Sequence, residues 1–266
     1  MRLVFDIGGT NTRLALAEGA RLSQERVIPT PATPAEFFVA VAEYLAGKEV
    51  AEAAGGVAGA VAGHTFLGGA HLSEAWEGAD FSAGFAALGV GRLALVNDAE
   101  AAAFGEAVAG AGKGYRLVAY LTLSTGVGGA LVEEGRLAPH AGGFEPGHQI
   151  IEEGSGMTLE EAVGGAAIAK EYGKPGEELP QEVFDARVPS LAAGLYNLIE
   201  LWSPEVIVLG GALARAGRYP LPALRAALEK LPPPPRMPAL AEGALGDAAG
   251  LLGSALLPIE KAAPIA

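Results

Sequence analysis

Short apolar runs alternate with helical segments along this chain. Four runs have the length and composition of buried strands: residues 2–7, 93–96, 117–123 and 205–209. Other segments have the apolar spacing or capping signals of helices: residues 37–45, 99–108, 158–172 and 186–202. Strands that alternate with helices predict an α/β fold. A composition that is 50% hydrophobic, rich in Gly and poor in aromatic residues, suits helices packed closely on sheets.

The first strand leads into a glycine-rich turn and a returning strand. The turn reads Gly8-Gly9-Thr10-Asn11, and the pattern of residues 12–17 predicts a returning strand. Consecutive glycines let backbone N–H groups approach an anion, and Asp6 at the strand end could hold a metal ion against the same phosphate. An ordinary hairpin explains these residues equally well, because Gly-Gly turns are common and Asp often ends strands.

The same design recurs in the second half of the chain. The strand at 117–123 is followed by the sequence STGVGGA, which contains Thr125 and Gly126, and residues 131–137 predict the returning strand. Two such hairpins in separate halves could bind a phosphate chain from opposite sides. The loop at residues 110–115 predicts a domain boundary between the halves.

Asn97 and Asp98 follow the strand at residues 93–96, at the strand end where open α/β sheets place ligands. A carboxylate there could accept a proton from a hydroxyl. Asn97 could equally cap the following helix with Glu100 as its partner, because Asn is favoured at helix starts.

Other candidate ligand residues lie on constrained turns. Glu145 and His148 share the loop GGFEPGH, where two side chains can read adjacent hydroxyls. If Thr158 caps the next helix with Glu161 as its partner, Glu160 is left to point elsewhere. After the strand at 205–209, Gly210-Gly211 permits the close passage of a nucleotide base or phosphate.

Composition and charge exclude several classes of protein. The chain has 266 residues and a formal net charge of −13, which argues against nucleic-acid binding because no basic patch can neutralise phosphates. It contains no Cys, which excludes disulfides, thiolate zinc sites and Cys nucleophiles. No apolar run approaches transmembrane length, and the start lacks the basic segment and apolar core of a signal peptide. We therefore expect a cytoplasmic enzyme with no membrane partner.

Taken together, these segments resemble the ROK family of sugar kinases and sugar-responsive repressors, within the actin, hexokinase and Hsp70 ATPase superfamily. The matching motifs occur in the family's order and cover most of the chain: DIGGTNTR at 6–13, ND at 97–98, GAGKGYRLVAYLTLSTGVGGA at 110–130, EPGH at 145–148, LE at 159–160 and PEVIVLGG at 204–211. The resemblance implies an α/β fold of two ribonuclease-H-like domains, with the active site in the cleft between them. The expected domains are residues 1–112 plus 246–266 and residues 113–245.

The resemblance also implies a role for each motif. Asp98 would be the general base that activates a sugar hydroxyl, and Asp6 would orient Mg²⁺ through water. The residues expected to hold the sugar are Asn97, Glu145, His148 and Glu160. The residues expected to bind ATP, through its phosphates or its adenosine, are Asp6, Gly8, Gly9, Thr10, Asn11, Thr125, Gly126, Gly210 and Gly211.

The implied function is an ATP-dependent, glucokinase-like sugar kinase that phosphorylates the 6-hydroxyl of a hexose, with glucose as the first choice. Fructose, mannose, N-acetylmannosamine and N-acetylglucosamine stay open as substrates. Polyphosphate stays open as the donor, although the acidic charge disfavours a long polyanion. The family tendency leads us to expect a homodimer.

Two rival hypotheses come from other classes. Family repressors carry a DNA-binding helix-turn-helix before the kinase-like part, whereas the phosphate hairpin here starts at residue 2. Together with the acidic charge, this start disfavours a sugar-binding regulator. A non-catalytic sugar or nucleotide binder is the second rival, and the presence of Asp6, Asp98 and both glycine turns argues against it.

The chain departs from the family pattern at two places that matter for ligands. Many members build a zinc site from the motif His and three Cys, but residues 152–158 here contain no Cys, so we expect no zinc. The family usually carries an Asn a few residues before the Trp of the sugar loop, whereas this loop, His71 to Trp76, has none. Trp76 could face a ligand or could only pack, and the altered loop weakens the assignment of the sugar.

Overall fold

The computed structural model describes residues 1–69 and 72–259, which form two units. Unit 1 comprises the described residues of Met1–Gly105, together with His140–Gly143 and residues 248–259. Unit 2 comprises Glu106–Pro139 and Phe144–Asp247. Among the described residues, no helix combines the length and the apolar character needed to cross a bilayer.

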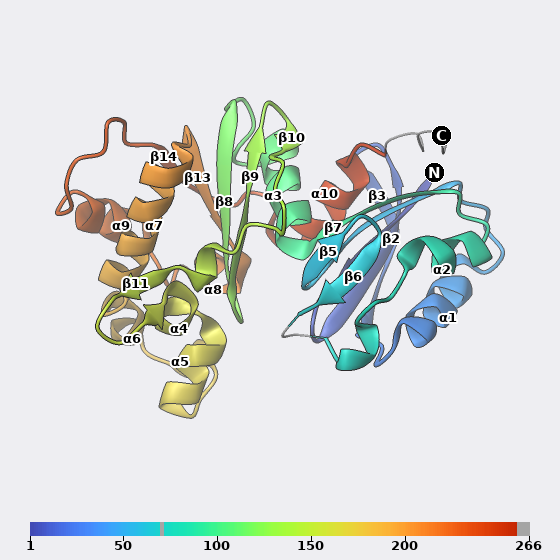
Figure 1. Ribbon diagram of the computed structural model, residues 1–266, viewed down its shortest axis with the longest axis horizontal. Coiled ribbons are helices and arrows are strands. Elements are labelled where there is room, and N and C mark those ends of the chain that lie inside the picture. The colour runs from blue at the N-terminus through green and yellow to red at the C-terminus, as the bar shows by residue number, and fades with distance from the viewer. Residues whose placement is uncertain (70–71, 260–266) are drawn as a thin grey trace. The chain divides into compact units, whose positions relative to one another are not determined.

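Unit 1 is built on a five-stranded mixed sheet in the order β3-β2-β1-β4-β7 (Figure 1). β1 pairs antiparallel with β2, which pairs antiparallel with β3, whereas β4 and β7 add to the other side in parallel. These strands are β1 (Arg2–Ile7), β2 (Asn11–Glu18), β3 (Arg21–Pro29), β4 (Glu52–Val57) and β7 (Arg92–Asn97). The remaining elements of the unit are α1 (Pro34–Leu45), β5 (Ala60–Ala62), β6 (Thr65–Gly68), η1 (Glu74–Trp76), α2 (Phe81–Ala87), the start of α3 (Asp98–Ala109) and α10 (Ala249–Leu256).

Alternate residues of β1 face two different layers, as the twofold period of a strand requires. Leu3, Phe5 and Ile7 belong to the core that α1 and α2 cover, whereas Val4 packs in a cluster with residues of α10. Figure 1 shows α1 and α2 on one side of this sheet and α10 on the other. The same alternation places Asp6 on the α10 side, where its carboxylate lies against Gly250.

Six aromatic rings fill the layer between the sheet and helices α1 and α2. Their centroids lie 5.2 to 6.5 Å from their neighbours, and the residues are Phe5, Phe37, Phe38, Trp76, Phe81 and Phe85. Trp76 is fully buried among them, and its indole N–H donates to the carbonyl of Pro31 at 3.2 Å. Packing is therefore the role of Trp76, and the suggestion that it faces a ligand is wrong. His71 lies outside the described residues.

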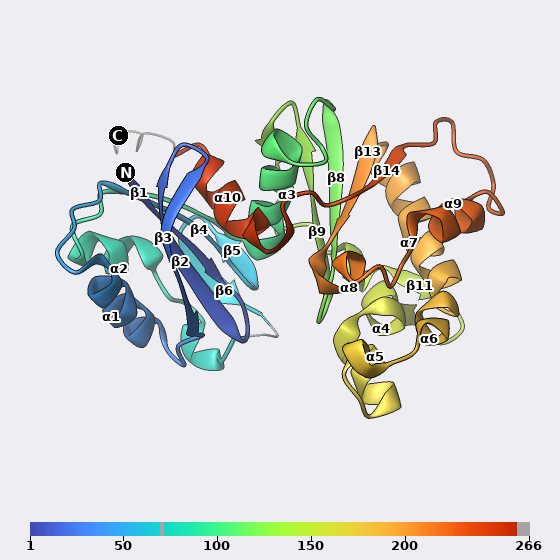
Figure 2. The same ribbon diagram turned by 180° about the vertical axis from the view of Figure 1, so that it is seen from behind.

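Unit 2 repeats the sheet of unit 1, with the order β10-β9-β8-β13-β14 and the same pattern of antiparallel and parallel pairs. The strands are β8 (Leu117–Leu123), β9 (Val127–Glu133), β10 (Arg136–Leu137), β13 (Val206–Gly210) and β14 (Ala239–Glu242). Helices α7 (Val188–Trp202) and α9 (Leu221–Leu228) lie side by side, as both views show (Figure 2), and share one core with β8 and β13. The other elements are η2 (Pro146–His148), β11 (Ile150–Glu152), β12 (Met157–Thr158), α4 (Leu159–Val163), α5 (Gly165–Tyr172), η3 (Gly176–Glu178), α6 (Gln181–Asp185), α8 (Gly211–Arg215) and η4 (Gly246–Ala248), which ends at the first residue of unit 1's last segment.

The returning strand of the second hairpin begins earlier than predicted. The sequence predicts a strand at residues 131–137, whereas β9 begins at Val127 and a turn with positive φ at Glu134 and Gly135 ends it. A Cβ added at Gly129 would lie 2.8 Å from Cγ of Pro146, so this glycine serves close packing within a strand. The hairpin turn is correspondingly short, and Thr125 and Gly126 lie at its tip.

Residues 158–172 form two helices, α4 and α5, and not the single predicted helix. Gly164 between them adopts extended backbone, with φ −73° and ψ 142°. A Cβ at this position would lie 2.6 Å from the carbonyl oxygen of Glu160. The break turns the first N–H groups of α5 toward the second hairpin turn.

Candidate functional site

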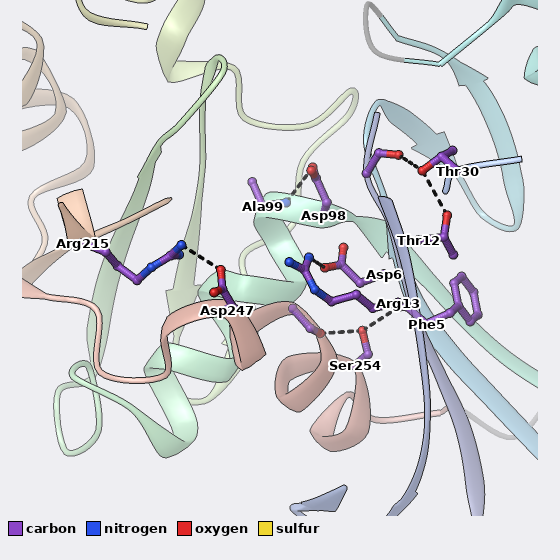
Figure 3. Close-up of polar contacts among 12 residues, drawn as sticks. Phe5, Asp6, Thr12, Arg13, Thr30, Asp98, Ala99, Arg215, Asp247 and Ser254 are labelled. Carbon is purple, nitrogen blue, oxygen red and sulfur yellow. Dashed lines mark hydrogen bonds and ion pairs between the residues drawn. The ribbon is translucent and has the colours of Figure 1, made fainter. Parts of the chain in front are cut away.

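Two carboxylates lie near each other at the carboxyl ends of parallel strands of the unit 1 sheet (Figure 3). Asp6, near the end of β1, pairs in parallel register with Gly56 of β4, and a Cβ on Gly56 would lie 2.9 Å from Cα of Asp98. The missing side chain therefore lets the first turn of α3 approach the sheet beside Asp6. The strand–glycine–helix arrangement brings together Asp6 and Asp98, which the sequence places in separate motifs.

The environment of Asp6 disfavours its ionised form. Burial and the nearby charge of Asp98 raise the pKa of Asp6 to about 6, against an ordinary value of 3.8. Arg13 opposes this rise, because its Nη1 lies 3.4 Å from Oδ2 of Asp6. The negative charge of Asp6 and Asp98 is therefore only partly balanced by Arg13.

We expect Asp6→Asn to raise the free energy of unfolding at neutral pH. Because the folded pKa lies above the unfolded value, the contribution of Asp6 to stability is fully present below about pH 4 and is lost as the pH rises through about 6. The neutral amide escapes this penalty. Thermal unfolding in metal-free buffer should therefore show a higher midpoint for the variant near pH 8, and curves that converge near pH 4. A difference in thermal midpoint between the variant and the wild type that stays constant with pH would contradict the raised pKa of Asp6.

Asn97 and Glu100 cap the start of α3. Asn97 Oδ1 accepts from the Ala99 N–H at 2.8 Å, and Glu100 Oε2 accepts from the Asn97 N–H at 3.0 Å. The Asn97 amide also donates to the carbonyl of Gly59 at 2.9 Å. The capping interpretation is confirmed, whereas a contact between Asn97 and a sugar stays a prediction.

Thr30, which belongs to none of the sequence motifs, stabilises the first hairpin turn. Within the turn, the Gly8 N–H donates to the Asn11 carbonyl at 3.0 Å. Thr30, the residue after β3, donates its hydroxyl to the Gly8 carbonyl at 2.6 Å and its N–H to the Thr10 carbonyl at 2.9 Å. Its hydroxyl also lies 3.2 Å from that of Thr12 (Figure 3). The turn is therefore held in shape, while Thr10 and Asn11 stay exposed.

The second hairpin turn is held by the start of α5. The Ser124 N–H donates to the Gly126 carbonyl at 3.0 Å. The N–H groups of Gly165 and Ala166 donate to the carbonyls of Ser124 and Thr125 at 2.7 and 2.8 Å. The Thr125 side chain remains exposed, so this turn, like the first, is rigid and accessible.

Glu160 is bound to the same turn. Thr158 and Glu161 form the predicted capping box, which is confirmed. Glu160 points away from this cap, and its Oε2 accepts from the Val127 N–H at 2.8 Å. The residue expected to hold the sugar thus lies beside the residues expected to hold phosphate.

The turn that carries Glu145 and His148 packs on the start of β9. Both side chains are exposed, and the His148 N–H donates to the Glu145 carbonyl at 3.1 Å. Gly147 between them lies so close to the Val127 carbonyl that a Cβ would overlap it. Unit 2 therefore gathers Glu145, His148, Glu160 and the second hairpin turn around Val127.

Gly210 and Gly211 also pack tightly on β8. A Cβ at Gly210 would overlap the Tyr120 hydroxyl, and one at Gly211, where φ is 87°, would overlap the Leu123 carbonyl. Packing alone accounts for glycine at both positions, and their contact with adenosine stays a prediction. Within residues 1–69 and 72–259, no group of three or more His, Asp or Glu side chains is arranged to hold a metal ion.

Over residues 2–261 the chain matches the family model described as ROK family. It is 33% identical over 289 residues to the bifunctional enzyme NanE/NanK of Brucella melitensis, with 95% of this chain and 53% of that protein covered. It is 29% identical over 305 residues to the N-acetyl-D-glucosamine kinase of Pectobacterium atrosepticum, with 95% and 97% covered. The chain spans about half the length of the bifunctional relatives that it matches.

The fold has a close counterpart among solved structures. The ROK hexokinase from Thermus thermophilus matches with a TM-score of 0.80 and 27% identity, and 96% of each chain is covered. This likeness confirms the predicted α/β fold of two ribonuclease-H-like units of the actin-like ATPase type. The family match over nearly the whole sequence agrees with the motifs in their order, and the chain belongs to the ROK family.

Proposed function

We propose that this chain is an ATP-dependent sugar kinase that transfers the γ-phosphate of ATP to the 6-hydroxyl of a hexose, with glucose as the first substrate to test. The observation that carries the proposal is a pair of neighbouring carboxylates next to the glycine turn that Thr30 holds in shape. Asp6 lies near the carboxyl end of β1, and Asp98 directly follows β7. Phosphoryl transfer needs positioning and charge stabilisation more than covalent chemistry. Two of the relatives, a hexokinase and an N-acetyl-D-glucosamine kinase, are sugar kinases by name and support this class.

Asp98 is the proposed general base. Its Oδ1 accepts from the Ala99 N–H at 2.9 Å, which fixes the carboxylate at the first turn of α3. The carboxylate would accept the proton of the sugar 6-hydroxyl. At the same time the hydroxyl oxygen would form a bond to the γ-phosphorus, and the bond from that phosphorus to the leaving ADP oxygen would break.

Mg²⁺ fits the carboxylate of Asp6. Burial and the charge of Asp98 both raise the pKa of this group, and a bound cation would offset both effects. Mg²⁺ keeps several of its waters and needs only one or two carboxylates, so the small number of acidic groups here is sufficient. Asp6 would hold the ion through water, and the ion would neutralise charge on the ATP phosphates.

The two braced turns are the proposed phosphate-binding elements. In both turns, hydrogen bonds from neighbouring segments fix the backbone while the tip stays accessible. Preformed backbone N–H groups bind anions without a cost for ordering the loop. The full set proposed for ATP is Asp6, Gly8, Gly9, Thr10, Asn11, Thr125, Gly126, Gly210 and Gly211.

Asn97 in unit 1 and Glu145, His148 and Glu160 in unit 2 are the proposed sugar contacts. The exposed carboxylate and imidazole of Glu145 and His148, on a turn anchored to β9, support a role in reading adjacent hydroxyls. The names of two relatives support N-acetylglucosamine and N-acetylmannosamine as candidates after glucose. Fructose and mannose stay open as further substrates to test. A homodimer without zinc is the proposed state of the protein.

The proposed function is tested by ADP release from Mg-ATP over a panel of hexoses and N-acetylhexosamines with a no-sugar blank. We expect one sugar to stimulate release well above the blank and to yield a 6-phosphate, identified by ³¹P NMR. The same panel with polyphosphate tests the alternative donor. A flat panel with both donors, in protein that still binds ATP, would overturn the kinase assignment.

A further inference from the structure

A four-residue segment of the chain belongs to a different unit from the sequence around it. Residues 106–139 and 144–247 form unit 2, but His140–Gly143 groups with unit 1. The imidazole of His140 contacts the carboxylate of Glu100 on α3 through Nε2. The Gly143 N–H donates to the other ring nitrogen, Nδ1, at 2.7 Å.

These two contacts define the proton positions on the ring. Because Nδ1 accepts from a backbone N–H, it carries no proton in this arrangement, and Nε2 is the nitrogen that donates to Glu100. The Glu100 side chain is only 8% exposed, so the hydrogen bond is largely shielded from water.

Glu100 connects this ring to the start of α3. Its second oxygen accepts from the Asn97 N–H, immediately before Asp98. One carboxylate thus binds both the cap of the helix that carries the proposed base and the imidazole of a distant loop. His140 and Glu100 are separated by 40 positions in the sequence.

The segment after His140 leads directly to a proposed sugar residue. Gly143 lies two positions before Glu145, and the intervening Phe144 packs edge-on against Trp202 with ring centroids 5.1 Å apart. The two residues before Glu145 are therefore both held in place: Gly143 by its hydrogen bond to the His140 ring, and Phe144 by its contact with Trp202.

We propose that His140 is a positioning residue for the sugar. Acting through Glu100 and Gly143, it fixes both the cap that precedes Asp98 and the segment that precedes Glu145. The positioning role rests on the proposed kinase function. The two hydrogen bonds of the His140 ring, to Glu100 and from the Gly143 N–H, do not depend on that function, and together they are called the clasp below. Neither the ring nor Glu100 needs to touch substrate or the transferred phosphoryl group.

His140→Ala should raise the KM for the sugar about tenfold while the KM for ATP stays near wild type. His140→Gln should restore much of the loss, because its amide nitrogen can donate to Glu100 in place of Nε2. The matched control is His64→Ala, which removes an exposed imidazole whose Nδ1 is hydrogen-bonded to the hydroxyl of Ser82, and it should leave both KM values unchanged.

Amide hydrogen exchange tests the clasp apart from the kinase function. In His140→Ala, exchange at Gly143 and Asn97 should accelerate, even if the wild-type protein phosphorylates no sugar in the panel. Unchanged exchange at both amides would overturn the clasp. Two results would show that His140 is only a structural residue and would overturn the positioning role. One is a lower thermal midpoint with an unchanged sugar KM, and the other is a sugar KM raised equally in the Gln and Ala variants.

Discussion

Asp98→Asn should lower the rate of phosphoryl transfer by about a thousandfold and leave sugar binding largely intact, given the usual contribution of a general base. The amide has the size of the carboxylate, and its Oδ1 can still accept from the Ala99 N–H, so the start of α3 is preserved. What the variant loses is a group that can take the hydroxyl proton. The measurement is the turnover number with the sugar found in the panel, together with the dissociation constant for that sugar by calorimetry.

The control for this variant is Asp185→Asn, the same change at an exposed carboxylate on α6, which should retain wild-type turnover. A second readout shows whether the site is intact. Because the charge of Asp98 raises the pKa of Asp6, the Asp98→Asn variant should titrate Asp6 at a lower pH than wild type. Turnover near the wild-type rate in the variant would remove Asp98 as the base.

Local patterns predict much of the fold because strands and turns leave signals within a few residues. β8 occupies residues 117–123 as predicted, since a short segment that is apolar except at Thr122 and is bounded by loop residues has few alternatives. The repeated hairpin design also follows from the sequence, and the two sheets have the same order. The start of β9 was not predictable in this way, because glycine there relieves crowding by Pro146 and does not form a loop.

Contacts between distant segments account for most of what the sequence does not reveal about the site. Thr30 braces the first turn from 22 positions away, and His140 reaches Glu100 across 40 positions. Each is a single polar residue in a loop with no local motif, so no spacing rule could select it. The closeness of Asp6 and Asp98 likewise depends on Gly56, a residue of a third strand.

The crossing of α3 and α10 explains why two further glycines are needed near the site. A Cβ at Gly253 of α10 would overlap the carbonyl oxygen of Ala101 and lie 3.0 Å from the Gly105 nitrogen, both on α3. A Cβ at Gly105 would lie 2.7 Å from the carbonyl oxygen of Ala249. The backbones of the two helices therefore meet directly, and neither obstacle is a flexible side chain that could move aside.

Gly253→Ala should destabilise the protein by about 3 kcal/mol, typical of severe overpacking, and lower the thermal midpoint by roughly 6–12 °C. Helix propensity alone predicts the opposite sign, because Ala is favoured over Gly inside a helix by about 1 kcal/mol. The control is Gly91→Ala, where φ is not positive and nothing lies within 4 Å of the added Cβ, and its midpoint should stay near wild type. Since α3 carries Asp98, displacement of this helix should also reduce turnover in the folded variant. A midpoint for Gly253→Ala equal to or above wild type would show that the helices can separate without cost, and that α10 does not fix the position of α3.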